Sequence, residues 1–225
     1  MILAIETSNP SAALDAASVA LVEMIGAASS VRAVELLRPM DHHDDGLIAA
    51  IDRACRAVRV RPRDLTRIAV SIGPGGFTAL RIAAATAKVL GEAIGAPCVS
   101  VPTAEIVARR VEAPSPFAVA LASKGDSAHL TLFRGAGDDR GTTLGIARAG
   151  DLERLGIVSL IADKFLPKPM ADECARLGIE RHRPIFDPVA CAEIAAARDP
   201  IDPVNLLPLY PREPEAVALW RQRQG

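Results

Sequence analysis

The chain has 225 residues, a formal net charge of −1 and a hydrophobic content of 50%. This length suits one large domain or two domains of about 100 residues each, and the apolar content excludes a mainly disordered chain. The near-neutral charge and the aromatic content of 3% argue against a protein that holds nucleic acid by itself, because that function uses clustered cations and stacking rings.

Short apolar runs at 2–5, 18–22 and 31–37 favour strands, and the turn-forming residues Asn9 and Pro10 follow the first of them. From 44 to 58 the apolar residues recur at helical spacing instead. The stripe that they form consists of Leu47, Ile48, Ile51, Ala54, Cys55 and Val58. Residues 65–72 predict a further strand, and residues 78–94 predict a long helix that stops at Gly95.

The elements predicted beyond residue 97 are shorter. A strand at 98–101 and a helix at 102–110 precede Pro114 and Pro116, which mark a joint. Residues 117–122, 129–134 and 142–147 alternate like strands, residues 151–155, 173–177 and 188–197 have helical character, and the proline-rich tail is extended until about 215. We therefore expect a duplicated α/β architecture with mixed sheets, divided into residues 1–112 and a smaller part at 113–225 whose tail packs back.

Cysteine spacing and apolar run length indicate the compartment. The four cysteines are far apart without metal-binding spacing, so we expect free thiols in a reducing environment. The N-terminus has no basic segment and reaches Glu6 at once, unlike a signal peptide. No apolar run approaches the roughly 20 residues that span a bilayer. We expect a cytoplasmic protein without membrane contact.

A glycine-rich loop joins the strand at 65–72 to the long helix. Such a loop can offer backbone N–H groups to a phosphate at the helix N-terminus, with Gly73, Gly75, Gly76 and Thr78 as the candidate contacts. The same glycines equally suit a tight turn with close packing. The loop has neither the P-loop lysine nor the spacing of dinucleotide-binding loops. Both interpretations stay open.

The helix at 78–94 is apolar around almost its whole circumference, since only Arg81, Thr86, Lys88 and Glu92 are strongly polar. A surface helix shows one apolar stripe, so this helix should be covered on two sides. Its alanines allow another helix to approach closely. The second cover is either the helix at 44–58 of the same chain or another protein.

Several segments together resemble the TsaB (YeaZ) family: residues 2–8, His42, the string 73–82, residues 86–90 and the tail segment 207–212. The string Gly-Pro-Gly-x-Phe-Thr-x-Leu-Arg is quite specific, and the match covers the first hundred residues well. The resemblance implies an actin/Hsp70-like (ribonuclease H-like) fold of two related subdomains. It also implies a role in making N6-threonylcarbamoyladenosine (t6A) in tRNA.

In that family the chain would be a non-catalytic accessory subunit without a cofactor. It would bind and stabilise a TsaD-like catalytic subunit, act beside a TsaE-like ATPase, pair with itself when isolated, and reach tRNA only through the complex. By this resemblance the helices at 44–58 and 78–94 contact the partner, with an interface made of Leu47, Ile48, Ile51, Cys55, Leu80, Ala83, Ala84, Ala87 and Leu90. Replacing Ala84 or Ala87 with glutamate should then disrupt pairing.

The chain departs from the family pattern at four places. Gly76 stands where the family has serine, and Ala79 and Ala83 stand where it has glycine. The second half has Ala-Ser-Lys at 122–124 where the family often has Asp-Ala-Arg. Such losses are easier to accept in a scaffold than in an enzyme.

Other residues keep rival functions open. Adjacent histidines in the cluster 42–45 point in different directions and no H-x-x-x-H spacing exists, so we expect helix capping there and no metal. Glu6 either faces a phosphate, as in actin-like ATPases, or is a polar turn residue. Arg212, Arg221 and Arg223 either contact a phosphate backbone or are solvated. The rival functions are an actin-fold small-molecule kinase, a metallopeptidase-like enzyme, or a homodimeric binding module. No catalytic residue is assigned.

Overall fold

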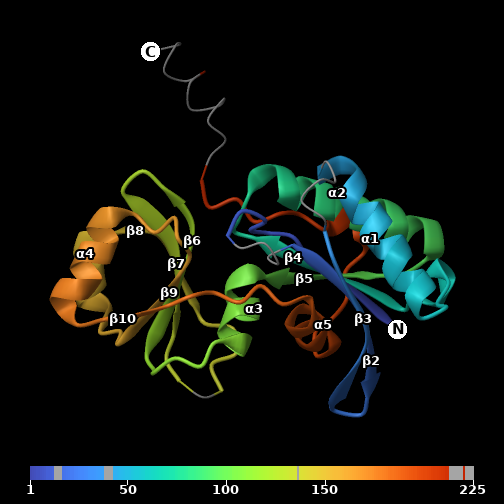
Figure 1. Cartoon of the computed structure of the whole chain (residues 1–225), viewed down its shortest axis with the longest axis horizontal. Coiled ribbons are helices and arrows are strands. Elements are labelled where there is room, and N and C mark those ends of the chain that lie inside the picture. The colour runs from blue at the N-terminus through green and yellow to red at the C-terminus, as the bar shows by residue number, and fades with distance from the viewer. Residues whose placement is uncertain (13–16, 38–42, 136, 213–219, 221–225) are drawn as a thin grey trace.

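A computed structural model describes residues 1–12, 17–37, 43–135, 137–212 and 220. It contains two five-stranded sheets flanked by helices (Figure 1). The first part of the chain forms β1 (Ile2–Glu6), β2 (Ser18–Ile25), β3 (Ala28–Leu36), α1 (His43–Ala57), the 3-10 helix η1 (Pro62–Asp64), β4 (Arg67–Gly73), α2 (Phe77–Ile94), β5 (Cys98–Pro102) and α3 (Thr103–Arg110). The second part forms β6 (Phe117–Lys124), β7 (Ser127–Phe133), β8 (Thr142–Arg148), η2 (Ala149–Leu155), β9 (Ser159–Ala162), α4 (Lys168–Leu177), β10 (Glu180–His182), α5 (Pro188–Ala196) and η3 (Pro203–Asn205).

Both sheets follow the same topology. In the first, β1, β2 and β3 form an antiparallel meander, β1 pairs with β4 in parallel, and β4 pairs with β5 in parallel. In the second, β6, β7 and β8 form the meander, while β9 and β10 add the parallel pairs. The strand orders β3-β2-β1-β4-β5 and β8-β7-β6-β9-β10 are therefore equivalent. The predicted duplicated α/β fold with mixed sheets is confirmed.

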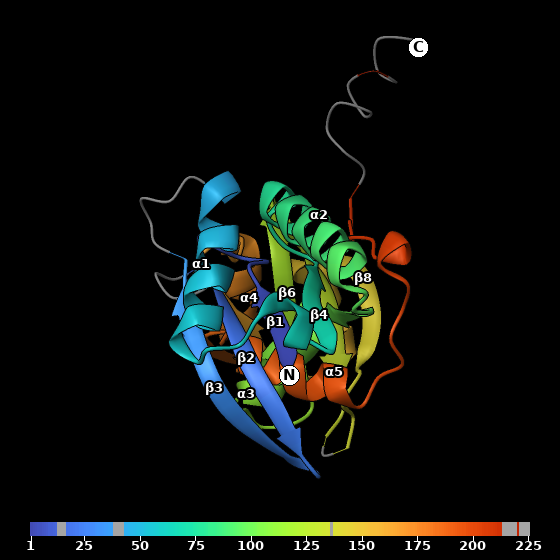
Figure 2. The ribbon, with the colours of Figure 1, turned by 90° about the vertical axis from the view of Figure 1, so that its right-hand side faces the viewer.

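Helices cover both faces of the first sheet, with α1 and α2 side by side on one face and α5 on the other (Figure 2). The first face packs Leu3, Ile5 and Val70 against Leu47 of α1 and Ala83 of α2. Because β1 and β4 are buried on both faces, their sequences read as continuous apolar runs rather than as alternating ones.

The last helix of each half packs on the sheet of the other half. The α3 residues Ala104 and Val107 share a core with Phe117 and Phe133 of the second sheet. The α5 residue Ala190 packs instead with Ile2 and the other strands of the first sheet. The chain passes from the first sheet to the second between Pro102 and Phe117. The helix α5 then returns to the first sheet. This exchange joins the two halves through shared cores.

Two predicted elements need correction, and two strands were missed. The helix expected at 173–177 begins earlier, at Lys168, and the helical segment at 151–155 is a 3-10 helix. The strands β9 and β10 were not predicted, since they have only four and three residues. The helical end expected after 215 lies almost wholly outside the described residues. No described helix combines the length and apolarity that crossing a bilayer would need.

Candidate functional site

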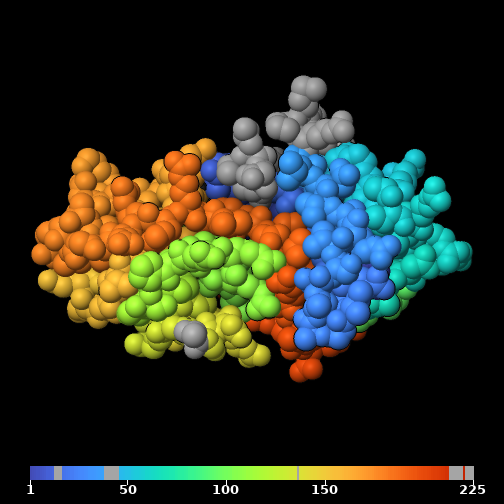
Figure 3. Space-filling model, turned by 60° about the horizontal axis from the view of Figure 1, so that its bottom comes forward, coloured from blue at the N-terminus to red at the C-terminus, as the bar shows by residue number. Residues whose placement is uncertain are grey.

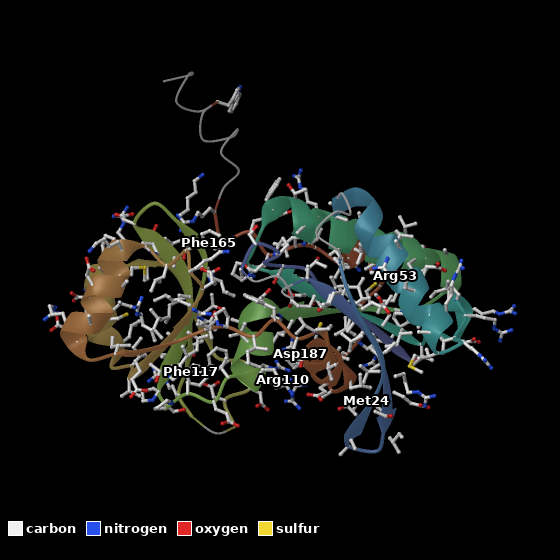
Figure 4. The ribbon with its side chains drawn as sticks, in the orientation of Figure 1. Met24, Arg53, Arg110, Phe117, Phe165 and Asp187 are labelled. Atoms are coloured by element: carbon white, nitrogen blue, oxygen red, sulfur yellow. The ribbon has the colours of Figure 1, made fainter. Side chains whose placement is uncertain are left out.

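The carboxyl ends of β1, β4, β6 and β9 meet between the two halves, where ligands bind in open α/β sheets. Residues that follow or end these strands line a pocket of about 230 Å³. They are Asn9, Pro10, Ser11, Ala12, Gly75, Gly76, Ala122, Ser123, Asp163 and Phe165. Figure 4 labels Phe165, which lies on the side of the second sheet that faces α2.

The glycine-rich loop is packed tightly against its neighbours. A Cβ on Gly75 would lie 2.1 Å from the carbonyl oxygen of Ser8, and one on Gly73 would lie 2.7 Å from a methyl group of Leu80. The Gly76 amide donates a hydrogen bond to the same Ser8 carbonyl at 2.6 Å. Close packing against backbone therefore explains Gly75, and the positive φ of 102° explains Gly73. Gly76 and Thr78 are exposed, and contact between a phosphate and any of the four predicted loop residues stays a prediction.

Glu6 does not line the pocket but is fully buried at the end of β1. Its Oε1 accepts hydrogen bonds from the amide and the hydroxyl of Ser8, at 2.8 and 2.6 Å. Its Oε2 has no hydrogen-bond partner in the part of the chain that the structure describes. Burial raises the pKa of this carboxyl, because charge is disfavoured away from water. Glu6 is therefore a buried group that fixes the turn after β1.

Replacing Glu6 with glutamine should flatten the pH dependence of stability. Because the folded-state pKa of Glu6 is raised above 4.5, the folded protein keeps a proton that the unfolded chain releases, so the free energy of unfolding falls as the pH rises above that value. E6Q carries no charge and still offers an oxygen to Ser8. Urea unfolding at about pH 5 and about pH 8 measures the difference. Equal pH slopes for both proteins would contradict it.

The pocket offers little that a phosphate ligand needs. Asp163 is its one ionisable side chain among the described lining residues, and burial raises the pKa of that carboxyl. One Asp163 oxygen accepts the Phe165 amide at 2.9 Å. The volume of 230 Å³ is below the range of about 300–1,000 Å³ that small-molecule sites have. No group of three or more metal-binding side chains gathers among the described residues.

The tail crosses from the first half to the second beside the glycine-rich loop. The Leu209 amide donates to the end of β4 at 2.7 Å, and the Tyr210 ring lies 4.8 Å from the ring of Phe77. Arg212 then donates to the β6–β7 hairpin, including the Ser127 hydroxyl at 3.2 Å. Arg212 thus has partners inside the chain. Arg221, Arg223 and His42 lie outside the described residues, as do the side chains of 43–45.

A larger hollow of about 580 Å³ lies on another face, between α3, α5 and the β7–β8 loop (Figure 3). The charged side chains that α3 and α5 contribute to it are paired: Arg109 contacts Glu193 at 3.0 Å, and Arg110 lies beside Asp187, as Figure 4 shows. Glu105 forms an ion pair with Arg198 while burial raises the pKa of that carboxyl to about 7. These pairs hold α3 to α5 and the residues beside it, so the paired side chains have a structural explanation.

The structure places most of the predicted interface side chains inside the chain's own core. Seven of them are at most 7% exposed, namely Leu47, Ile51, Cys55, Leu80, Ala83, Ala84 and Ala87. The reason is that the apolar stripes of α1 and α2 both face the first sheet. A partner that binds these helices would meet little of those seven side chains while the chain stays folded, and their contact with a partner stays a prediction. Ile48 is 56% exposed, and Leu90 is half-buried.

Other side chains of α2 face outward and were missed from the sequence. They recur at every fourth position as Phe77, Arg81, Ala85, Val89 and Ala93, and all five are exposed. We call this row the outer ridge. Val89 is 71% exposed, and the Arg81 guanidinium lies 3.9 Å from the centre of the Phe77 ring. Such ridges of every fourth residue fit into the grooves of another helix, where small alanines leave room.

Comparisons with known proteins agree with this architecture. The TsaD family, described as tRNA N6-adenosine threonylcarbamoyltransferase, matches residues 38–177. YeaZ from Pseudomonas aeruginosa has a similar structure, with a TM-score of 0.66 and 18% identity over 93% of this chain and 98% of that one. A protein described as similar to peptidase YEAZ from Pseudomonas aeruginosa gives a TM-score of 0.65 and 21% identity over 94% of this chain and 99% of that one. The fold is therefore the predicted actin/Hsp70-like one. The chain belongs to the TsaD family and, as its sequence predicts, is a YeaZ (TsaB)-like member of it by fold.

Proposed function

We propose that the chain is a non-catalytic accessory subunit in t6A modification of tRNA, and that it binds and stabilises a TsaD-like catalytic subunit. Its family membership supports an involvement in this modification. The observation that carries the accessory function is the outer ridge of α2, an exposed row of mainly apolar side chains on a helix whose opposite face is already buried.

The outer ridge has the composition of a protein contact. Phe77, Val89 and Ile48 of the adjacent α1 expose large apolar side chains, and water favours the burial of such a patch. Arg81 lies over the ring of Phe77, and arginine is one of the residue types that dominate binding energy at interfaces. A helix of the partner packed along this ridge would contact α1 as well. A second copy of the chain is the proposed occupant of the ridge when the partner is absent.

The rival enzymatic functions have less support. A small-molecule kinase needs phosphate ligands, and a metallopeptidase-like enzyme needs a metal site. The pocket between the halves has one carboxylate and a small volume, and its loop glycines pack against backbone. A TsaE-like ATPase within the same complex would supply the nucleotide chemistry that this pocket does not favour. Calorimetric titration of the isolated chain with ATP and Mg²⁺ tests this, since tight binding with turnover would favour the kinase.

Replacing Val89 with glutamate should abolish binding to the TsaD-like subunit from the same genome while the variant stays folded. The side chain is 71% exposed in the isolated chain, so a carboxylate there is hydrated, whereas in the complex it would be buried without a partner. Size exclusion of the mixed proteins measures complex formation, and circular dichroism measures folding. We expect at least a hundred-fold weaker binding, about 3 kcal/mol.

The matched control is Ile185→Glu, an equally hydrophobic and 50% exposed position between β10 and α5. This variant should bind the partner like the wild type. If the wild-type chain does not co-elute with the catalytic subunit, the accessory function is wrong. If V89E binds as well as I185E does, the ridge is the wrong surface although the accessory function can stand.

A further inference from the structure

Positive charge is concentrated in one short segment of this nearly neutral chain. Between residues 53 and 67 the sequence has six arginines and one acidic residue, Asp64, whereas the whole chain has a net charge of −1. The arginines are Arg53, Arg56, Arg59, Arg61, Arg63 and Arg67. They lie at the C-terminal end of α1, in η1 and at the start of β4. In Figure 1 this is the cyan end of the first half, far from the second sheet.

Four of the six have partners within the chain. Arg53, Arg56 and Arg61 contact carboxylates at 3.2, 2.9 and 3.0 Å, respectively. Arg67 donates to backbone carbonyls at the end of α5. Arg59 and Arg63 are exposed, and their guanidinium groups make no ion pair or hydrogen bond within the part of the chain that the structure describes. Two cations therefore remain available beside two exposed ion pairs, those of Arg56 and Arg61.

The backbone at Arg59 does not explain why arginine stands there. Its φ is 57°, a left-handed conformation that glycine adopts without strain and other residues adopt with a penalty. The Val60 amide donates to the Cys55 carbonyl at 2.9 Å and the Arg59 amide donates to that of Arg56 at 3.2 Å, the bonding pattern that usually ends a helix on glycine. What the arginine adds at this position is an exposed cationic side chain.

We propose that Arg56, Arg59, Arg61 and Arg63, which we call the arginine end of α1, contact the phosphate backbone of the tRNA that is being modified. Guanidinium groups bind phosphates through paired N–H donors, and such contacts hold RNA without reading its sequence. The inference rests on the proposed function, which brings a tRNA to the complex, and it gives this subunit a direct contact instead of an indirect one.

The location of the arginine end fits a tRNA held mainly by the partner. The helix α1 has 15 residues and is therefore about 22 Å long. Ile48, beside the outer ridge, lies near its start, and the arginines follow its end. An RNA bound to a catalytic subunit on the ridge would need to extend only one helix length to reach them. Few aromatic residues are needed for this, because phosphate contacts do not depend on base stacking.

The double variant Arg59→Gly and Arg63→Gln tests the contact without threatening the fold. Glycine suits the left-handed backbone at position 59, so the melting temperature should be unchanged or higher. The tRNA affinity of the complex with the catalytic subunit is measured by fluorescence anisotropy at several salt concentrations. We expect Kd to rise about ten-fold at low salt, and the slope of log K against log salt to fall by about 1 to 2.

The control removes the same charge elsewhere, as Arg181→Gln and Arg183→Gln, both exposed at β10 in the second half. It should leave affinity and slope unchanged. If the complex assembles but the arginine variant matches this control, the tRNA contact is wrong while the accessory function stands. If the arginine variant weakens assembly and not tRNA binding, the arginine end binds protein and the inference is also wrong. If even the wild-type complex does not assemble, both proposals fail.

Discussion

Replacing Gly75 with alanine is expected to lower the melting temperature by roughly 10 °C or more, which corresponds to about 3 kcal/mol or more for a chain of this size. The added Cβ would lie 2.1 Å from the carbonyl oxygen of Ser8 and 2.8 Å from its carbonyl carbon. Both are backbone atoms, so no side-chain rotation relieves the clash. The next residue also donates a hydrogen bond of 2.6 Å to that same carbonyl. The turn after β1 and the loop after β4 would have to separate.

Gly76→Ala is the matched control for this prediction. A Cβ there would lie 3.6 Å from the nearest atom, which is ordinary contact, and its φ of −66° is allowed for alanine. Thermal unfolding followed by circular dichroism should separate the two variants clearly. If G75A is as stable as G76A, the loop opens readily, and the glycines would then be better explained by a ligand than by packing.

The sequence predicted the first half of the fold better than the second, for a physical reason. In α1, polar residues such as Asp52 and Arg56 alternate with apolar ones, so the helical period is visible. β9 and β10 have only four and three residues, and their hydrogen-bond partners are distant in sequence. The duplication was predicted from the sequence, and the order of the strands adds which strand of one sheet is equivalent to which strand of the other.

The candidate surfaces were harder to predict than the fold. On α2 nearly every position is apolar, so periodicity cannot tell the side that faces the sheet from the side that faces solvent. Ala84 is buried and Ala85 is exposed, although the two residues are chemically identical. Only the tertiary contacts decide which of the two alanines faces the sheet and which faces solvent. The arginine end of α1 was missed because net charge averages over the whole chain, and its four arginines are balanced by acids elsewhere.

The position of α5 on the first sheet bears on the accessory function. Because α5 packs on the first sheet, the face of the first half opposite α1 and α2 is filled by the chain itself. The α1 and α2 layer therefore remains as the face of the first half where a large partner can add a further layer. The outer ridge belongs to that layer.

Ala85→Glu and Ala87→Glu should separate partner binding from folding, because the two positions lie two residues apart on opposite sides of α2. Ala87 is fully buried in the core between α2 and the first sheet. A carboxylate there would be buried without a partner, which costs several kcal/mol out of a total stability of about 5–15 kcal/mol. A87E should thus fail to fold cooperatively, so the loss of pairing that the sequence predicts for it would follow from loss of the fold.

A85E should instead keep the wild-type melting temperature to within about 2 °C, because its carboxylate is exposed on the outer ridge. Its binding to the TsaD-like subunit should weaken by about a hundred-fold or more, since the contact would bury that charge. Chemical unfolding and size exclusion with the partner measure the two effects on the same samples. A folded A85E that still binds would remove the ridge as the partner surface. A stable A87E would mean that α2 can leave the sheet, and that the seven buried side chains are available to a partner after all.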